Sequence, residues 1–178
     1  MYYVRTMLVW VTGNPGAGKS TACATLRARG HAAVDADWDG YCRWTDRANA
    51  DVVDDPPYPA PQGWLDRHGW TIDRAKVEAL AAGSRDTVTF LCGSVENEAD
   101  IGDLLDVVIC LVVDDETVRQ RLTTRTTNAF GRNPEELAAA LQHNAQQEAR
   151  YRRRGATIVD ATRSPFEVVD LIVARVAE

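Results

Sequence analysis

The sequence has no long hydrophobic run and only a few scattered cysteines. Its longest wholly apolar stretch, residues 107–113, is far shorter than the roughly 20 residues that a membrane helix needs. The four cysteines form neither CxxC pairs nor a Cys/His cluster, which argues against a zinc site or a disulfide framework. The apolar N-terminal stretch runs into a glycine loop without the cleavage site of a signal peptide. We therefore expect a cytoplasmic protein that does not span a membrane.

The chain also has fewer basic than acidic residues. The chain has 20 Lys and Arg against 26 Asp and Glu, which gives a formal net charge of −6. A surface of this sign repels polyanions. We therefore expect no nucleic acid as a main partner.

The remaining composition is that of one ordinary globular domain. The chain has 178 residues, of which 45% are hydrophobic and 26% charged, and domains usually span roughly 100 to 200 residues. Five short apolar runs alternate with longer amphipathic segments, which is typical of βα units around a parallel sheet. These runs are residues 7–12, 31–35, 87–92, 107–113 and 157–160. The sequence predicts an α/β fold with a five-stranded parallel sheet in a single domain over residues 1–178.

Two helix starts and one irregular segment can also be located. Asn133 before Pro134, and Ser164 before a proline and a glutamate, predict helices that begin near residues 134 and 165. Residues 49–69 are rich in proline and have no sustained period, so we expect a long irregular loop there. Loops of this length are often lids or binding loops, although an insertion that is merely mobile is the alternative.

A glycine-rich motif follows the first apolar run and precedes a helical stretch. It satisfies GxxxxGK[ST] and consists of Gly13, Asn14, Pro15, Gly16, Ala17, Gly18, Lys19 and Ser20, with Thr21 next in the chain. Such glycines let backbone N–H groups turn inward around a phosphate chain, and the following helix adds the positive end of its dipole. We expect Lys19 to reach the β- and γ-phosphates and Ser20 to ligate Mg²⁺. The motif predicts a site for ATP, with Mg²⁺ as its cofactor.

Two aspartates end the second expected strand. Asp35 and Asp37 are alternate residues, so they can project together at the edge where open α/β sheets bind ligands. Two carboxylates beside a phosphate site suggest that one holds Mg²⁺ through water and the other accepts a hydrogen bond from an acceptor hydroxyl. The alternative is that either one is a helix cap or a solvated turn residue.

With the glycine loop and the DAD sequence of residues 35–37, the chain resembles the small P-loop kinases of the adenylate, shikimate and gluconate kinase group. The resemblance covers nearly the whole chain and implies a three-layer α/β/α P-loop NTPase fold. It implies an irregular acceptor-binding segment at about residues 38–72 and a short lid at about residues 125–134. It also implies that Asp35 assists Mg²⁺ and that Asp37 contacts the acceptor hydroxyl.

Two arginines follow the fourth expected strand. Arg121 and Arg125 are four residues apart, so they share one face of a helix. They resemble the RxxxR of adenylate-kinase-like enzymes, which implies that Arg121 lies over the adenine and Arg125 reaches the phosphates. The alternative is a solvated arginine face that pairs with nearby acids. The resemblance further places Arg132 in the lid and Thr162 in the loop that packs against the adenine edge.

The acceptor residues are harder to predict. The third expected strand is followed by Gly93, Glu96 and Asn97, without the arginine that the resemblance predicts for a nucleoside monophosphate kinase. The acceptor therefore looks less anionic than AMP, and Glu96 and Asn97 suit hydroxyl or amine groups unless they simply begin the next helix. Arg150 lies near the position of an acceptor-binding arginine in shikimate-type kinases, or is a solvated cation at a helix end. Arg43 is a further candidate, although it stands later than the adenylate kinase position.

Three functions remain open. The first is an ATP- and Mg²⁺-dependent kinase that phosphorylates a hydroxyl of a small molecule such as a sugar, cyclitol, nucleoside or antibiotic-like metabolite. The second is a nucleoside monophosphate kinase, with a phosphate clamp supplied by Arg43, Arg47, Arg67 or Arg85. The third is a nucleotide-dependent ATPase switch or binding module, which the missing aspartate at the end of the third strand disfavours.

Overall fold

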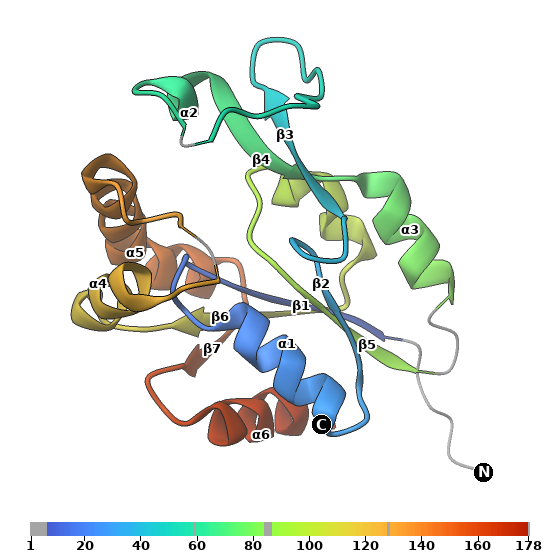
Figure 1. Ribbon diagram of the computed structural model, residues 1–178. Coiled ribbons are helices and arrows are strands. Elements are labelled where there is room, and N and C mark those ends of the chain that lie inside the picture. The colour runs from blue at the N-terminus through green and yellow to red at the C-terminus, as the bar shows by residue number, and fades with distance from the viewer. Residues whose placement is uncertain (1–6, 59, 84–86, 128, 178) are drawn as a thin grey trace.

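Five parallel strands form the central sheet of the protein. The computed structural model describes residues 7–58, 60–83, 87–127 and 129–177, and Figure 1 shows their arrangement. The strand order is β2-β5-β1-β6-β7. The strands are β1 (Met7–Gly13), β2 (Ala32–Asp35), β5 (Val88–Cys92), β6 (Val107–Val112) and β7 (Thr157–Asp160). All five predicted strands, and their parallel pairing, are confirmed.

The alternation of β1 divides the core between the two faces of the sheet. Val9 and Val11 are fully buried in the cluster that contains side chains of α1 (Lys19–Ala28) and α6 (Pro165–Val176). Leu8 and Trp10 belong to the opposite cluster, with side chains of α3 (Arg74–Gly83) and the 3₁₀ helix η1 (Glu98–Leu104). Each buried aliphatic side chain contributes roughly 1.5–3 kcal/mol. The layers are therefore helix, sheet and helix, as predicted.

Two helices follow β6 and are joined by a loop. In α4 (Asp115–Thr124), the side chain of Asp114 accepts a hydrogen bond of 2.7 Å from the N–H of Thr117 at the first turn. The 20-residue helix α5 (Pro134–Arg153) begins with Asn133 as its cap, which confirms the predicted start. The connection between them coincides with the predicted lid, in which residue 128 lies outside the described residues.

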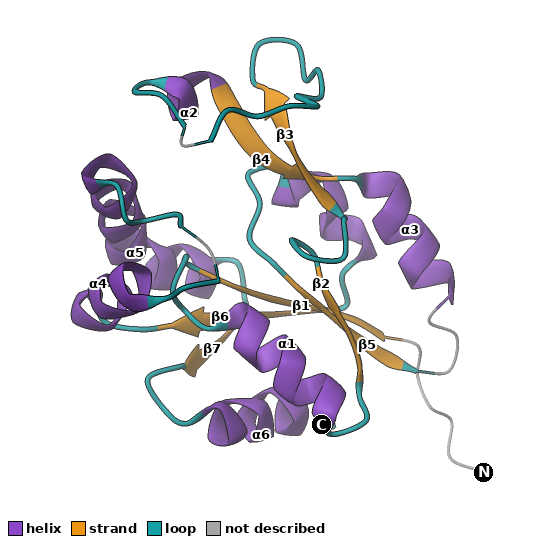
Figure 2. Ribbon diagram, viewed as in Figure 1, coloured by secondary structure: helices purple, strands orange, loops and turns teal. Residues whose placement is uncertain are grey.

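A second, two-stranded sheet lies apart from the main one (Figure 2). Its antiparallel strands are β3 (Cys42–Asp46) and β4 (His68–Ile72), and the short helix α2 (Trp64–Arg67) precedes β4. The prediction of an irregular segment across residues 38–72 is therefore wrong at both of its ends. Because more than 20 residues separate the paired strands, no short turn signal marks them as a hairpin. The proline-rich stretch between them is irregular as expected, with residue 59 outside the described residues.

The second sheet is held together by aromatic packing. Trp44 and Trp70 are directly opposite each other in the β3–β4 register, with ring centroids 5.1 Å apart. Trp64 packs edge-on against Trp44 at 4.8 Å and stacks on His68 at 4.1 Å. Aromatic pairs of this kind contribute about 0.5–1.5 kcal/mol beyond the area that they bury. Trp44, Trp64, His68 and Trp70 therefore form a half-buried aromatic cluster that joins β3, α2 and β4.

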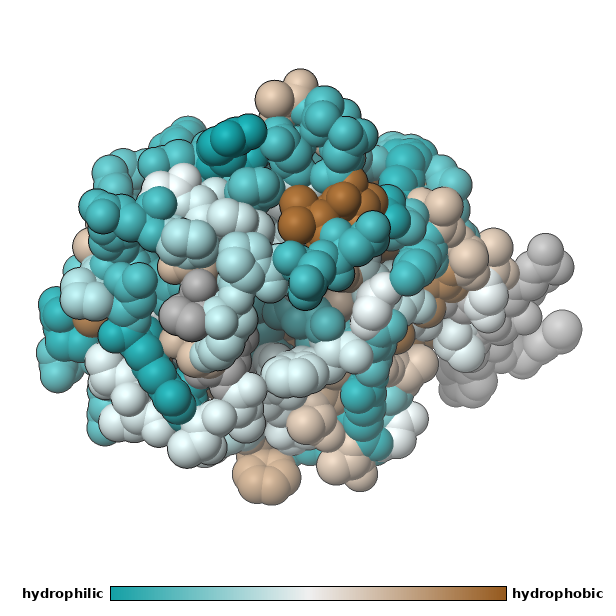
Figure 3. Space-filling model, turned by 45° about the horizontal axis from the view of Figure 1, so that its top comes forward, coloured by the Kyte–Doolittle hydropathy of each residue, from teal (hydrophilic) through white to brown (hydrophobic). Residues whose placement is uncertain are grey.

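The surface is largely hydrophilic on the face that Figure 3 shows, with one compact hydrophobic patch. Within the described ranges, no helix is both long enough and apolar enough to span a membrane.

The start of α6 gives a test of the capping analysis. The N–H of Ser164 donates to the Glu167 carboxylate at 3.1 Å, and the Ser164 hydroxyl accepts from the N–H of Glu167 at 3.4 Å. We expect Ser164→Ala to lower the free energy of unfolding by about 1 kcal/mol, because the N–H of Glu167 loses its acceptor and the Glu167 carboxylate loses the Ser164 hydroxyl. Urea denaturation measures this. The control Ser164→Asp keeps a capping oxygen and should stay near wild type; equal losses in both variants would contradict the assignment.

Candidate functional site

The glycine loop lies at the carboxyl end of the central strand. It leaves β1 at Gly13 and enters α1 at Lys19, as Figure 1 shows. Gly16 and Gly18 have φ angles of +87° and +97°, which glycine adopts without strain. The first N–H groups of α1 have no carbonyl partner within the helix, so they point out of its N-terminus and favour an anion. The loop therefore fits a phosphate chain.

The Lys19 ammonium is held inside this loop. Its Nζ donates to the carbonyl oxygens of Gly13 at 2.8 Å and Asn14 at 3.0 Å. Burial lowers the pKa of Lys19, whereas the nearby carboxylate of Asp37 acts to raise it. Asp35 also raises this pKa and Arg125 lowers it, so all three charges lie near the ammonium. Four residues predicted from the sequence therefore lie near one another: Lys19, Asp35, Asp37 and Arg125.

The two aspartates after β2 have different surroundings. Asp35 is 5% exposed, and its Oδ1 accepts hydrogen bonds from the N–H groups of Asp37 at 3.1 Å and Trp38 at 3.3 Å. Asp35 therefore caps the turn that follows β2, which is the alternative that the sequence left open. The Asp37 carboxylate accepts a hydrogen bond of 2.8 Å from the indole Nε1 of Trp70 in β4. Trp70 thus orients Asp37, and this role could not be read from the sequence.

A magnesium ion would depend on the nucleotide at this site. Within the described residues, no group of three or more His, Cys, Asp or Glu side chains could hold a metal by itself. Mg²⁺ is commonly held by one or two side chains together with substrate phosphates. Ser20, exposed in the first turn of α1, and Asp35 fit that arrangement.

Arg121 links the phosphate loop to the loop after β7. Its Nη1 donates to the carbonyl of Gly16 at 3.1 Å and its Nη2 to that of Ala161 at 3.0 Å. Thr162, next in the chain, donates its hydroxyl proton to Asp160 at 2.6 Å. Arg121 and Thr162 therefore lie in the same corner of the site.

Two further arginines lie in the predicted lid. Arg125 donates to the carbonyl of Phe130 at 2.7 Å, and Arg132 donates to the carbonyl of Arg125 at 2.7 Å. Burial lowers the pKa of Arg125, and the charge of Arg132 lowers it further. Two cations held this close to each other favour an anion between them.

Several predicted acceptor residues have structural partners instead. Asn97 uses both ends of its amide on Ile72: its Oδ1 accepts from the N–H at 2.9 Å, and its Nδ2 donates to the carbonyl at 3.1 Å. Arg43 lies in β3, where it pairs with Asp73 at 3.1 Å. Glu96 accepts from Nε of Arg47 at 2.9 Å. These three side chains join the second sheet to the body of the protein.

Gly93 serves close packing at the end of β5. A Cβ at this position would lie 2.8 Å from the Cβ of Ala36 and 2.9 Å from the indole of Trp10. Contacts this short do not occur, so the position has no room for a side chain. The structure thus explains this glycine without a ligand.

One face of α5 carries polar residues that the sequence analysis mostly missed. His143, Gln147 and Arg150 follow one another at helical spacing, and of these only Arg150 was predicted. Nη2 of Arg150 lies 3.2 Å from Nε2 of His143, and its guanidinium lies over the ring of Tyr151. Burial lowers the pKa of His143, and the charges of Arg150 and Lys19 lower it further. This face therefore borders the surroundings of Lys19, which the spacing of polar residues could have indicated.

Glu98 was also missed, and it joins three elements. Its carboxylate accepts from the indole of Trp10 in β1 at 2.9 Å and from the hydroxyl of Tyr151 in α5. Arg154 lies 3.4 Å from the same carboxylate. Burial and Glu98 raise the pKa of Tyr151, so its phenol stays protonated. The network fixes α5 against the strand that carries the phosphate loop.

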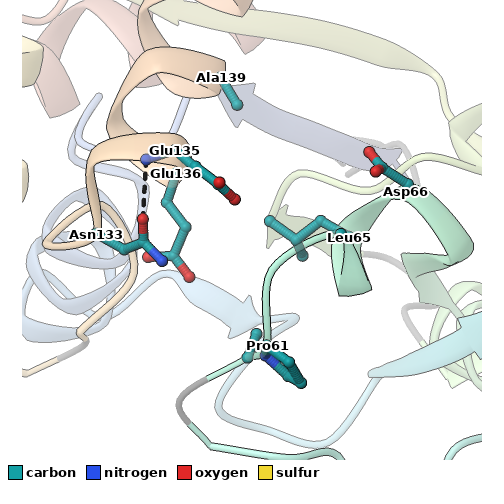
Figure 4. A pocket seen from close by; sticks show the side chains of 9 residues that line it. Pro61, Leu65, Asp66, Asn133, Glu135, Glu136 and Ala139 are labelled. Carbon is teal, nitrogen blue, oxygen red and sulfur yellow. Dashed lines mark hydrogen bonds between the residues drawn. The ribbon is translucent and has the colours of Figure 1, made fainter.

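A small cavity lies above this face of α5 (Figure 4). Its volume is about 130 Å³, and its walls come from residues 60–66 on one side and from the start of α5 on the other. Asp66 belongs to the first wall, and Glu135 and Glu136 to the second. The segment around α2 and the start of α5 therefore approach each other over an acidic opening.

The comparisons with known proteins place this geometry in a family. A family model described as an AAA domain, AAA_18, matches residues 9–142. The chain belongs to this AAA domain family. The matched region includes the glycine loop, Asp35, Asp37, Arg121 in α4 and Arg125 directly after α4. Comparison with curated proteins gives no match.

Solved structures of kinases share the fold. A deoxyadenosine kinase from M. mycoides has a TM-score of 0.55 at 15% identity, covering 97% of this chain and 100% of its own. A shikimate kinase from Acinetobacter baumannii has a TM-score of 0.57 at 15% identity, covering 97% and 96%. A sugar kinase from Janibacter sp. HTCC2649 has a TM-score of 0.55 at 16% identity, covering 96% and 94%. The resemblance to P-loop kinases is confirmed at the level of the fold.

The position of His143 predicts a pH dependence of stability. Because its pKa is lowered in the folded protein, the unfolded chain binds a proton at about pH 6.5, where the folded chain does not. The free energy of unfolding should therefore fall as the pH drops through about 6.5. In His143→Asn this part of the pH dependence should disappear, because asparagine does not bind a proton in this pH range. Urea denaturation between pH 5.5 and 7.5 measures it, and identical pH slopes in the two proteins would contradict the assignment.

Proposed function

We propose that the protein is an ATP- and Mg²⁺-dependent kinase that transfers the γ-phosphoryl group to a hydroxyl of a small molecule. The acceptor classes that fit are sugars, cyclitols, nucleosides and antibiotic-like metabolites. The observation that carries the proposal is that the Asp37 carboxylate, which the indole of Trp70 holds at 2.8 Å, lies near enough to the Lys19 ammonium of the phosphate loop to raise its pKa. A carboxylate at that point can meet an acceptor hydroxyl where the phosphoryl group leaves ATP.

Different residues of the chain bind different parts of ATP, the phosphoryl donor. The loop over residues 13–20 and the N-terminus of α1 hold the phosphates through backbone N–H groups. Lys19 and Arg125 neutralise the charge that spreads over the moving phosphoryl group. Arg121 and Thr162 border the place for the base. Ser20 and Asp35 would hold Mg²⁺ together with the nucleotide, and the ion would neutralise part of the phosphate charge.

The acceptor is oriented by Asp37. Its carboxylate accepts the proton of the hydroxyl that attacks the γ-phosphorus, and the indole of Trp70 keeps the carboxylate turned toward that place. The loop with Arg125 and Arg132 lies over the site and can exclude water, which would otherwise compete with the acceptor.

The other two functions have less support. Of the arginines considered for a monophosphate clamp, Arg43, Arg47 and Arg67 are paired with Asp73, Glu96 and Asp46, and Arg85 lies outside the described residues. Against an ATPase switch, this chain has no aspartate at the end of β5, where many such proteins use one to hold Mg²⁺. The solved structures of similar fold include kinases named for deoxyadenosine, shikimate and a sugar.

Two substitutions separate donor binding from transfer. We expect Lys19→Ala to abolish phosphoryl transfer, because the γ-phosphate loses its counter-charge. Asp37→Asn should also abolish transfer but leave ATP binding intact. Mass spectrometry of a panel of hydroxyl metabolites and nucleoside monophosphates, incubated with ATP and Mg²⁺, measures the product, and Asp170→Asn on the surface is the control. Normal turnover in Asp37→Asn would remove this residue from the mechanism.

Trp70 gives a subtler test. Trp70→Phe keeps an aromatic ring at this position but removes the indole N–H that donates to Asp37. Because hydrogen bonds to charged groups contribute about 1.5–3 kcal/mol, we expect kcat to fall at least roughly tenfold while KM for ATP is unchanged. The matched control is Trp64→Phe, which changes the same aromatic cluster. An equal fall of kcat in both variants would show that only the packing of the second sheet matters.

A further inference from the structure

Buried polar atoms without partners gather in one part of the molecule. Among the described residues that are not exposed, five buried side-chain atoms have no hydrogen-bond partner. They are Oδ1 of Asn14, Nε of Arg125, Nε2 and Oε1 of Gln147, and Nε of Arg150. All of them belong to the phosphate loop, the lid and α5. Folded proteins contain few such atoms, so their concentration beside the candidate site calls for an explanation.

Gln147 is the most unusual of these residues. It is 2% exposed, and both ends of its amide lack a partner. On one side of it along α5, Asn14 donates to the carbonyl of Ala140 at 2.9 Å, and on the other side the hydroxyl of Tyr151 lies 3.4 Å from that of Thr12. Gln147 lies between these two contacts, so its amide is held near the point where β1 becomes the phosphate loop.

The cost of this arrangement is considerable. An unsatisfied buried polar group lowers the stability of a folded protein, and Gln147 carries two of them. A leucine or methionine at this position would avoid the cost and suit a helix equally well. The arrangement therefore indicates that the amide has a partner in the working protein, which arrives with a ligand or as water.

The unpartnered atoms specify the chemistry of that partner. Oε1 of Gln147 and Oδ1 of Asn14 can only accept hydrogen bonds, whereas Nε2 of Gln147 and Nε of Arg150 can only donate them. An ionised carboxylate or phosphate has no hydrogen for the two oxygens, and an apolar group serves none of the four atoms. A hydroxyl both donates and accepts, so neighbouring hydroxyl groups can satisfy all of them.

Resting on the proposed function, we propose that Gln147, with Asn14 and Arg150, forms the acceptor subsite and recognises adjacent hydroxyl groups of a polyhydroxylated small molecule. Its place suits that role. Asn14 belongs to the phosphate loop and donates to Ala140 of α5, and the hydroxyl of Tyr151, one turn after Gln147, lies 3.4 Å from that of Thr12 in β1. The subsite therefore borders the end of the phosphate loop that holds Lys19.

A binding experiment tests the subsite without requiring turnover. The melting temperature of the protein, saturated with Mg²⁺ and a non-hydrolysable ATP analogue, is measured against increasing myo-inositol, D-glucose or D-ribose. Wild type is compared with Gln147→Met, which keeps the length of the side chain, and with Gln147→Glu, which keeps an oxygen but loses the donor. The matched control is Gln146→Met, since Gln146 is the exposed neighbour on the same helix.

We expect at least one polyol to raise the melting temperature of wild type and of Gln146→Met. Its apparent Kd should rise at least roughly tenfold in Gln147→Met, because the amide contributes more than one hydrogen bond. If Gln147→Met binds the polyol as well as wild type, the amide serves an internal water and the proposal is overturned. It is also overturned if no polyol stabilises wild type while the nucleotide analogue does. Absence of stabilisation by the nucleotide analogue itself would instead refute the proposed kinase function.

Discussion

The buried ammonium of Lys19 is the charge around which the rest of the site is arranged. Removing such a charge from water is costly unless polar groups surround it. Here the carbonyls of Gly13 and Asn14 accept its hydrogen bonds, and the carboxylates of Asp37 and Asp35 stabilise its charged form. These groups come from the ends of β1 and β2, which can approach each other only because parallel strands end at the same edge of the sheet.

The two faces of the sheet have different tasks. The face that carries Val9 and Val11 packs against α1 and α6 in an apolar core, which holds the phosphate loop in place. On the other face, Trp10 donates to Glu98, and Glu98 in turn accepts from Tyr151. This network ties α5 to β1, the strand that leads into the phosphate loop. Both faces of the sheet therefore carry an apolar core, and the second face adds the polar contacts that position α5.

Local signals made the strands, the glycine loop and the capped starts of α5 and α6 predictable from the sequence. The second sheet was not predictable in this way, because Trp44 and Trp70 pair across a long irregular segment. Remote contacts were equally hidden: Asn97 precedes η1, as the alternative to an acceptor role had it, but its two hydrogen bonds to the backbone of Ile72 could not be read from the sequence. The position of Gln147 on a helix face could have been read from its spacing, but its lack of partners appears only once β1 and α5 are packed together.

The central claim is that the phosphate loop directs the end of a nucleotide toward Asp37 and α5. A crystal structure of the protein with Mg²⁺ and a non-hydrolysable ATP analogue tests it most directly. The account predicts that the terminal phosphate contacts Lys19 and faces both the Asp37 carboxylate and the His143–Arg150 side of α5. A terminal phosphate that points away from Asp37, or a nucleotide bound outside the loop of residues 13–20, would contradict it.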